Sequence, residues 1–375
     1  MKKRGWNVVL SGLLAVGMMV SVAGCSQEPA APVAPAGTEA PAEAAGGVDA
    51  PEGGAGEDGG AAAEIAEEYH WTAAMTVAET TINYKIVERF KNLIEERSGG
   101  KITIDLYTGG QLGGDNEMFT SCRDGSIDII TSMSSGLVDF VPEEAVFDLP
   151  NLFPDVETMR KVLQGDFMDT MNVYNKQAGF MVLGYSDAGF RQLSSNKEIR
   201  TLNDFAGVKL RTMNNQYHMA YWEALGASPL PMDFNEVYMG LSQHTIDGQE
   251  NPYMNIVGNS FQEVQDYIVE TNHLGHIIIV CMNNALYDSL PENVRSLVDS
   301  CMEEAIAYGN EQADASIEAD KQTCIDAGCE IITLSQDDLS AMQEKAAVVY
   351  DMVRADLGDE LVDEVLAAVE EAENE

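Results

Sequence analysis

Apolar and polar residues follow regular patterns only from about residue 69 onward. Between residues 84 and 97 the apolar side chains recur every three or four positions, which predicts an amphipathic helix that ends before Gly99 and Gly100. Residues 102–107 alternate and are rich in β-branched side chains, which predicts a strand. The same reasoning predicts helices at 116–124, 159–163, 170–177, 217–225, 294–327, 337–354 and 359–373, and strands at 127–131, 181–185, 209–211 and 277–282. Strands that alternate with helices indicate an α/β sheet protein, and a region of about 300 residues favours two lobes over one.

The first 24 residues have the pattern of a secretory signal. Basic residues at positions 2–4 precede an apolar run over 8–22, which is too short for a typical membrane-spanning helix. The run ends in the sequence VAGC, which resembles the bacterial lipobox, where the cysteine is acylated. We therefore expect residues 1–24 to be removed and Cys25 to carry a lipid. An ordinary signal cleaved near Ala23, with an incidental cysteine, is the alternative.

The segment that follows has the composition of a linker. Residues 26–68 consist almost entirely of Ala, Gly, Pro and Glu, and they include ten acidic and no basic residues. Val33, Val48 and Ile65 are their only apolar residues larger than alanine. Such a segment cannot bury enough surface to offset its loss of conformational entropy. We expect residues 25–68 to be a lipidated cysteine and a disordered acidic tether that holds a soluble domain at the outer membrane face.

The chain is strongly acidic, because 62 Asp and Glu residues against 21 Lys and Arg residues give a formal charge of −41. Removal of residues 1–24 would leave 18 basic residues and a charge of −44. This balance argues against binding to nucleic acid, which requires clustered Lys and Arg. It also argues against docking on anionic lipid through a basic face, so we expect membrane contact through the lipid anchor only.

The cysteines leave two alternatives open. Besides Cys25, the chain contains five, so at least one is unpaired unless it pairs between chains. Cys324 and Cys329 are close enough in sequence for a local disulfide, and buried free thiols are equally consistent with their positions. No spacing of cysteines indicates a zinc site.

Signatures of catalysis are weak. The sequence GYSDA around Ser186 follows a predicted strand and approaches a nucleophile elbow, but Ala188 replaces the final glycine. The glycine-rich segment 109–114 lacks the GxGxxG spacing and the lysine of a phosphate-binding loop, so we interpret it as a turn before a helix. His273 and His276 are three residues apart, and two hydrogen-bonded histidines explain them more simply than a metal pair does. We expect no enzyme activity, no cofactor and no metal site.

Two arginines stand out because basic residues are scarce in this chain. Arg191 follows a glycine and a phenylalanine, and Arg211 ends the strand predicted at 209–211. The planar guanidinium group can donate two hydrogen bonds to one carboxylate. From the pattern alone, an ion pair within the protein is as consistent as a site for an acidic ligand.

A series of short motifs resembles the DctP-type solute receptors of TRAP transporters from about Trp71 to beyond Asp299. These motifs are SGGKITI (98–104), GQLG (110–113), GSID (125–128), LPNLF (149–153), GFRQL (189–193), GVKLR (207–211), LGASP (225–229), EVY (236–238) and IDGQENP (246–252). Each motif is modest, but their order and spacing together are specific. The resemblance implies an α/β, two-lobed periplasmic-binding-protein-like fold with crossover strands and a long helix that spans both lobes. Lobe I would comprise 69–188 plus 278–316, and lobe II 189–277 plus 317–375.

The resemblance also implies a ligand site in the cleft between the lobes. Arg211 would pair with a ligand carboxylate, and Arg191 would be a second donor. The amide of Asn251 can donate and accept, so it would hold the carboxylate and position the arginine. Phe234 would pack on the ligand, and Thr76 would make a polar contact.

The expected function is that of an extracytoplasmic receptor that captures a small organic acid and delivers it to the small and large membrane subunits of a TRAP permease. Met133 stands where sialic-acid receptors carry a glutamate, which implies a smaller or less polar acid than sialic acid. A sensory binding protein of the same fold, which feeds a membrane receptor, is one alternative. A secreted hydrolase that uses Ser186 is another, and it would need a histidine within hydrogen-bond reach of this serine.

Overall fold

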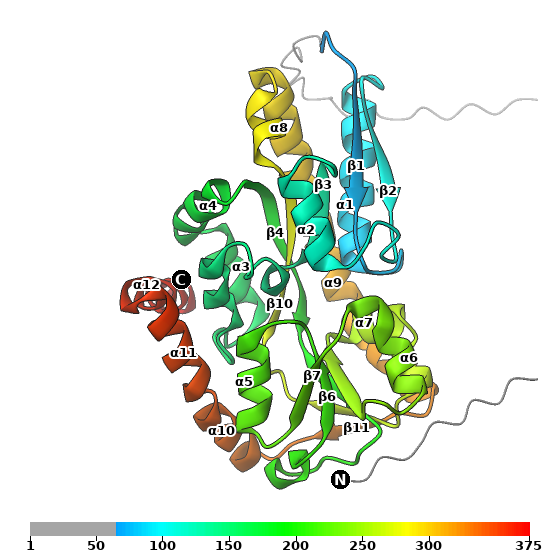
Figure 1. Cartoon of the computed structure of the whole chain (residues 1–375), viewed down its shortest axis with the longest axis vertical. Helices are drawn as coiled ribbons and strands as arrows, with labels where there is room; N and C mark the ends of the chain where they lie inside the picture. Colours follow the sequence, from blue (N-terminus) through cyan, green and yellow to red (C-terminus); the bar gives the residue numbers. More distant parts are fainter. Residues whose placement is uncertain (1–64) are drawn as a thin grey trace, which may run out of the picture. The chain divides into compact units, whose positions relative to one another are not determined.

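Two β-sheets form the framework of the protein in the computed structural model, which describes residues 65–375 (Figure 1). The predicted signal peptide, Cys25 and the tether up to residue 64 lie outside the described residues. The first sheet has the strand order β2 (Ile102–Tyr107), β1 (Tyr69–Ala74), β3 (Ile129–Met133), β10 (Gly275–Asn283) and β4 (Phe180–Phe190). The second sheet has the order β11 (Glu330–Thr333), β9 (Tyr267–Glu270), β5 (Gln192–Ser195), β8 (Gly248–Asn251), β6 (Lys209–Thr212) and β7 (Ser228–Pro231). The predicted α/β fold class is therefore confirmed.

Two of the crossings between the sheets run through neighbouring strands, and a third runs through α8 and α9 from β10 to β11. β4 of the first sheet continues through the single residue Arg191 into β5 of the second, and β9 returns through residues 271–274 into β10. β4 and β10 pair in antiparallel orientation, with Ile278 opposite Ser186. β10 is buried along its whole length, which explains its continuous apolar sequence.

Helices cover both sheets. Their bounds are α1 Ile82–Arg97, α2 Asp115–Arg123, α3 Val156–Gln164, α4 Phe167–Gln177, α5 Gln216–Ala224, α6 Val237–Ser242, α7 Tyr253–Gly258, α8 Asn284–Ser289, α9 Glu292–Asp326, α10 Gln336–Lys345, α11 Ala347–Leu357 and α12 Asp359–Asn374. Short 3₁₀ helices are η1 Ser134–Gly136, η2 Pro142–Asp148, η3 Leu202–Phe205, η4 Phe234–Glu236 and η5 Phe261–Glu263. None of the helices within residues 65–375 is long and apolar enough to cross a membrane.

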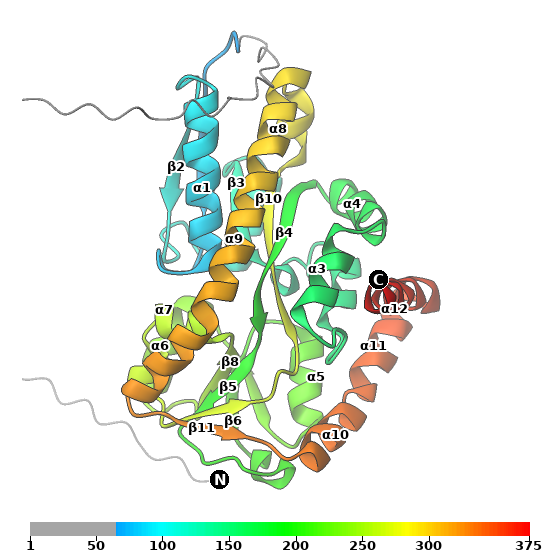
Figure 2. The same cartoon turned by 180° about the vertical axis from the view of Figure 1, so that it is seen from behind.

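The long helix α9 runs along both sheets (Figure 2). It packs against α1 and β4 beside the first sheet and against α7 beside the second. Its buried positions recur every three or four residues from Val294 to Ala313. A β-carbon at Gly309 would clash with Ile86, so glycine permits the close approach of α9 to α1.

The C-terminal helices contact elements attached to both sheets. α11 packs against α5, which follows β6, and α12 packs against α3, which precedes β4. Valines such as Val353 and Val365 join the apolar cluster that contains Phe147 and Trp222. The residue ranges of the two lobes stay a prediction.

Two predicted elements differ from the structure by more than shifts of up to three residues at their ends. The strand predicted at 181–185 extends over Phe180–Phe190, because the chain stays paired with β10 up to the crossing into the second sheet. The helix predicted at 337–354 is two helices that meet at Ala346. α10 packs against η3 and α11 against α5, so the two halves follow different surfaces.

The five cysteines of the described region are all buried free thiols. The Cys329 Sγ donates to the backbone oxygen of Gln265 at 3.1 Å. Of the two alternatives for Cys324 and Cys329, the structure therefore has the free thiols rather than the disulfide.

Candidate ligand-binding site

The candidate site is a cleft at the carboxyl ends of strands from both sheets. β1 and β3 lead to Thr76 and Ser132, whereas β6 and β8 carry Arg211 and Asn251 near their ends. In α/β proteins, ligands bind at such strand ends, where side chains and loops from several strands converge.

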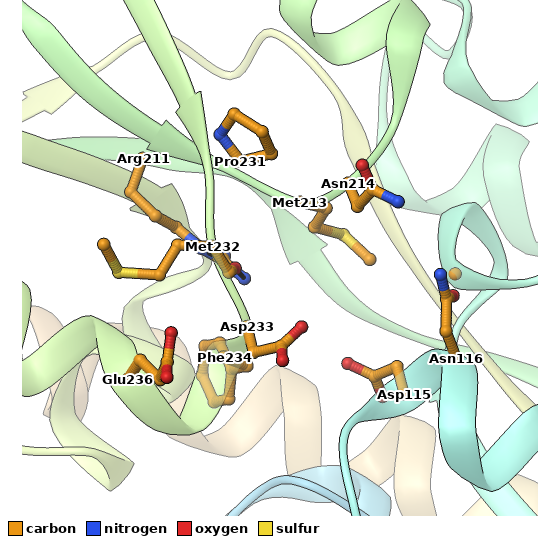
Figure 3. Close-up of a pocket in the computed structure, with 11 residues that line it drawn as sticks. Asp115, Asn116, Arg211, Met213, Asn214, Pro231, Met232, Asp233, Phe234 and Glu236 are labelled. Carbon is orange, nitrogen blue, oxygen red and sulfur yellow. Dashed lines mark hydrogen bonds between the residues drawn. The ribbon is translucent and has the colours of Figure 1, made fainter.

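The cleft consists of two adjoining cavities that share Asp115, Arg211, Met213 and Phe234. The outer cavity has a volume of about 360 Å³, and the inner one about 30 Å³. Figure 3 shows Asp115, at the start of α2, across the outer cavity from Arg211 and Phe234. The first sheet and the second sheet therefore supply opposite walls.

All five residues that the sequence proposed for ligand binding line the inner cavity. They are Thr76, Arg191, Arg211, Phe234 and Asn251. The first and last of them, at positions 76 and 251, are 175 positions apart, so the fold brings together segments that the sequence keeps far apart. Their contact with a ligand remains a prediction.

Arg211 is a buried cation that forms no ion pair with any described residue. Its side chain is 3% exposed, and its Nε and Nη2 donate to the backbone oxygen of Met232 at 2.9 and 2.7 Å. The Phe234 ring centre lies 5.6 Å from its guanidinium carbon. Burial lowers the pKa of Arg211 to about 10, so the side chain is a cation at neutral pH. A buried charge without a counterion is costly, which makes this position attractive to a carboxylate.

Arg191 has a carboxylate partner within the protein. Its Nη2 donates to Glu250 Oε1 at 2.8 Å, and its Nε donates to Glu250 Oε2. Its Nη1 contacts His276 Nδ1 at 2.6 Å and Met133 Sδ at 3.1 Å. The sequence left open an internal ion pair or a ligand site for each arginine, and the structure shows the ion pair for Arg191 only.

Histidines complete the surroundings of Glu250. The His273 Nε2 lies 3.1 Å from Glu250 Oε2. Burial alone would raise the pKa of Glu250, but Arg191 and His273 outweigh it and hold the pKa well below its usual range. Burial, together with Arg191, holds the pKa of His276 well below its usual range. Because an arginine can only donate, the Nδ1 of His276 is the acceptor. Within the described residues, no group of three or more His, Cys, Asp or Glu side chains is arranged to hold a metal ion.

Asp115 is a cavity residue that the sequence analysis missed. Its Oδ1 accepts hydrogen bonds from Ser132 Oγ at 2.8 Å and from Thr76 Oγ1 at 3.2 Å. Burial raises the pKa of this carboxyl group. Asp115 directly follows the glycine-rich segment 109–114, which we interpreted only as a turn. A polar residue at the end of such a turn, next to a predicted strand end, is the signal that could have identified it.

Two asparagines of the inner cavity were also missed. Asn83 and Asn255 are each 2% exposed, and the Oδ1 of each has no partner among the described residues. The Nδ2 of Asn255 donates to Asn251 Oδ1 at 3.2 Å, and the Nδ2 of Asn251 donates to Gln249 Oε1 at 2.5 Å. Nothing in the local sequence distinguishes these asparagines from ordinary helix residues.

Ser186 is not part of a catalytic arrangement. Its Oγ donates to Asn310 Oδ1 at 2.6 Å, and the side chain is 1% exposed. All five histidines lie in the described region, and their hydrogen bonds go to residues other than Ser186. The hydrolase alternative is therefore wrong.

Comparison with known proteins identifies the family. Residues 73–356 match the bacterial extracellular solute-binding proteins, family 7, also named DctP. The chain belongs to the DctP family. This DctP-family protein is 32% identical over 295 residues to the C4-dicarboxylate-binding periplasmic protein DctP of Shewanella loihica, which covers 78% of this chain and 88% of that protein. It is 33% identical over 262 residues to the 2,3-diketo-L-gulonate-binding periplasmic protein YiaO of Escherichia coli, which covers 68% and 78% of the two chains.

Solved structures share the fold of this DctP-family protein. A TRAP periplasmic solute-binding protein from Shewanella oneidensis with bound succinate matches with a TM-score of 0.77 and 28% identity, over 80% of this chain and 99% of that one. The sugar acid binding protein of Advenella mimigardefordensis in complex with galactonate matches with a TM-score of 0.79 and 26% identity, over 82% and 99%. The protein is thus a TRAP-type solute-binding protein of an extracytoplasmic family.

Proposed function

We propose that this DctP-family protein binds a small organic acid in the cleft and delivers it to the small and large membrane subunits of a TRAP permease. The observation that carries the proposal is the buried, positively charged Arg211, which has no carboxylate partner among the described residues. A ligand carboxylate would supply the missing counterion at this position. The named ligands of the compared structures, succinate and galactonate, are both carboxylates.

Binding would draw the two proposed lobes together. Arg211 and Asn251 belong to the second sheet, whereas Thr76 and Asp115 belong to elements of the first. A ligand that contacts both walls binds the closed arrangement more tightly than an open one, and this difference in affinity is what drives closure. The closed lobes would then be the form that the membrane subunits recognise.

The expected anchor is a lipid on Cys25, which lies outside the described residues. Metabolic labelling with a radioactive fatty acid tests it. We expect the full-length protein to incorporate label and to fractionate with membranes, and the Cys25→Ser variant to do neither. If the wild-type protein incorporated no label, the proposed lipid anchor would be wrong, and the proposed ligand site would be unaffected.

A thermal-shift screen of the purified protein tests ligand binding. The panel contains dicarboxylates, keto acids, sugar acids, sialic acid and aromatic acids, and the protein is first unfolded and refolded to remove any co-purified ligand. A ligand at about 100 times its Kd adds about 2.7 kcal/mol, which raises the Tm by a few degrees. We expect one class of acid to shift the wild type and the exposed control variant Arg200→Ala, but not Arg211→Ala. No shift with any acid would contradict the proposal.

A further inference from the structure

A chain of hydrogen bonds between buried side chains determines whether one wall of the inner cavity offers a donor or an acceptor to a ligand. We call this chain the relay. The relay starts at the backbone oxygen of Val264, which accepts from Gln265 Nε2 at 3.0 Å. Ser194 Oγ donates to Gln265 Oε1 at 3.1 Å, and Gln249 Nε2 donates to Ser194 Oγ at 2.8 Å. Gln265, Ser194 and Gln249 are at most 4% exposed, so solvent does not compete for these bonds.

The second half of the relay leads into the inner cavity. Asn251 Nδ2 donates to Gln249 Oε1 at 2.5 Å, and Asn255 Nδ2 donates to Asn251 Oδ1 at 3.2 Å. Asn255 lines the inner cavity, is 2% exposed, and its Oδ1 has no partner among the described residues. The relay therefore ends in an acceptor.

The order of this relay cannot be reversed without loss. A backbone oxygen can only accept, so Val264 requires the nitrogen of Gln265 on its side. If every amide were turned over, Gln265 Oε1 would face the Val264 oxygen, and two acceptors would meet without a hydrogen atom. The backbone thus determines that Asn255 presents Oδ1, rather than Nδ2, as its unpaired atom. The same order leaves one Nδ2 hydrogen of Asn251 available to donate, in addition to Arg211.

The opposite wall also offers acceptors. Asp115 accepts both of its hydrogen bonds on Oδ1, and its carboxyl group faces the cavity (Figure 3). The Asn83 Nδ2 donates to Thr131 Oγ1 at 3.1 Å, which leaves Asn83 Oδ1 buried and without a partner in the described region. A ligand that fills this cavity should present hydrogen-bond donors to Asp115 and Asn255, because unpaired buried acceptors are costly, and Asn83 Oδ1 is a third acceptor in the orientation that the structure has.

The charges of the cleft favour a ligand with one negative charge. Arg191 and Glu250 neutralise each other, which leaves Arg211 as the cation of the cavity walls that forms no direct ion pair within residues 65–375. Asp115 adds a negative charge on the opposite wall when ionised, and Asp233 and Glu236 add two more at the exposed outer cavity. A second ligand carboxylate would therefore lie among acidic groups and acceptors instead of beside a second free arginine.

We propose that the ligand is a monocarboxylate with several hydroxyl groups, whose carboxylate lies against Arg211 and whose hydroxyl groups donate to Asp115, Asn83 and Asn255. The same groups disfavour dicarboxylates and unsubstituted fatty acids. This inference rests on the proposed function, and it chooses among the kinds of acid that the compared proteins bind. It is consistent with Met133 in the cavity, since a hydroxylated acid of five or six carbons is smaller than sialic acid.

Isothermal titration calorimetry with four matched six-carbon acids tests the inference. Gluconate has one carboxylate and five hydroxyl groups, glucarate has a second carboxylate in place of the last hydroxymethyl group, and hexanoate and adipate have no hydroxyl groups. We expect gluconate to bind at least about tenfold more tightly than glucarate, and at least about 100-fold more tightly than hexanoate or adipate. A glucarate or adipate affinity equal to or above that of gluconate would overturn the inference, as would equal binding of hexanoate. Either of these outcomes would overturn the inference about the kind of acid, but the proposed function as an acid receptor that depends on Arg211 would still stand. If none of a broader acid panel bound, the proposed function itself would fail.

Two variants test the named acceptors. Asp115→Asn removes a charge and adds a donor, so we expect the gluconate-to-glucarate preference to fall by about tenfold, whereas Asp124→Asn, the same change at the exposed end of α2, leaves it unchanged. Ser194→Ala interrupts the relay without reaching the cavity. We expect it to reduce the preference for gluconate over hexanoate, with hexanoate affinity unchanged. A loss of affinity for all acids in equal measure would indicate a merely structural role of the relay and would overturn its part in specificity.

Discussion

Arg191 and Glu250 form an ion pair in which the two side chains are 1% and 0% exposed. Arg191 lies where β4 crosses into β5 and lines the inner cavity, and Glu250 lies on the neighbouring strand β8. Because Glu250 occupies Arg191, the two arginines of the cavity have different roles. Arg191 is neutralised by Glu250 within the protein, whereas Arg211 forms no ion pair with any described residue, and we therefore propose Arg211 as the partner of the ligand carboxylate.

Because Arg211 has no ion-pair partner among the described residues, its replacement should affect ligand affinity and protein stability differently. Arg211→Met should weaken acid binding by about 2–5 kcal/mol, which is at least about 30-fold in Kd. The free energy of unfolding without ligand should stay equal or rise, because the variant buries no lone cation. Titration calorimetry and urea unfolding measure the two quantities. A variant that binds normally, or one that loses about 3 kcal/mol of stability, would show that Arg211 is structural.

The Arg191–Glu250 pair should behave in the opposite way. Arg191→Leu and Glu250→Gln should each lower the free energy of unfolding by about 3–5 kcal/mol, since each leaves a buried charge without its partner. The double variant should cost less than the sum of the two by about 1–3 kcal/mol. The exposed pair Arg200–Glu330 is the matched control. A double-mutant cycle of this pair should yield a coupling free energy below about 1 kcal/mol. Additive effects at the buried pair would contradict the interpretation.

Glu144 should make stability depend on pH. Its side chain is fully buried, with Tyr185 and Asn175 both donating to Oε1. Burial raises the pKa of Glu144 from 4.5 to about 7. Between these values the unfolded chain releases the proton and the folded protein keeps it, so stability falls as pH rises from about 4.5 to 7.

The size of this effect follows from the shift and amounts to about 3 kcal/mol. Glu144→Gln should remove it, which is measured as the difference between the urea unfolding curves of wild type and variant across pH 4.5–8. Glu143→Gln, one residue earlier and less buried, is the control. Parallel pH profiles of wild type and Glu144→Gln would show that Glu144 titrates normally.

The sequence analysis predicted several strands with strong apolar patterns, but it missed the mostly polar strands β5 and β8 and also short strands such as β9 and β11. The strand at 277–282 was identified because it is continuously apolar. β5 and β8 have the sequences QLSS and GQEN, and every one of their residues is buried. Their polar side chains form the relay and the Glu250 pair, so only the fold gives them partners. A pattern based on hydrophobicity cannot detect strands whose buried side chains satisfy one another.

The sequence identified some residues of the candidate site and missed others whose role depends on contacts in the folded protein. Arg211 and Arg191 are conspicuous in an acidic chain, and family resemblance pointed to Asn251, Phe234 and Thr76. Asp115 was one acid among 62. Asn83 and Asn255 lie in helices, and nothing along the chain shows that their Oδ1 atoms face a shared cavity. Their significance depends on which partners they lack, which only the structure shows.

The thiol chemistry of the exported protein provides a further test. Burial raises the pKa of Cys122 to about 12, and all five described cysteines are buried, so they should not react with Ellman's reagent in the native protein. Denaturation should expose five additional thiols. A difference of three would indicate that Cys324 and Cys329 form a disulfide in the extracytoplasmic environment.

The most direct test of the account is a crystal structure with the best acid from the binding screen. The account predicts that the ligand carboxylate accepts hydrogen bonds from the Arg211 guanidinium group and from Asn251 Nδ2. Arg191 should remain paired with Glu250. A ligand bound elsewhere, or one whose carboxylate contacts neither Arg211 nor Asn251, would contradict it.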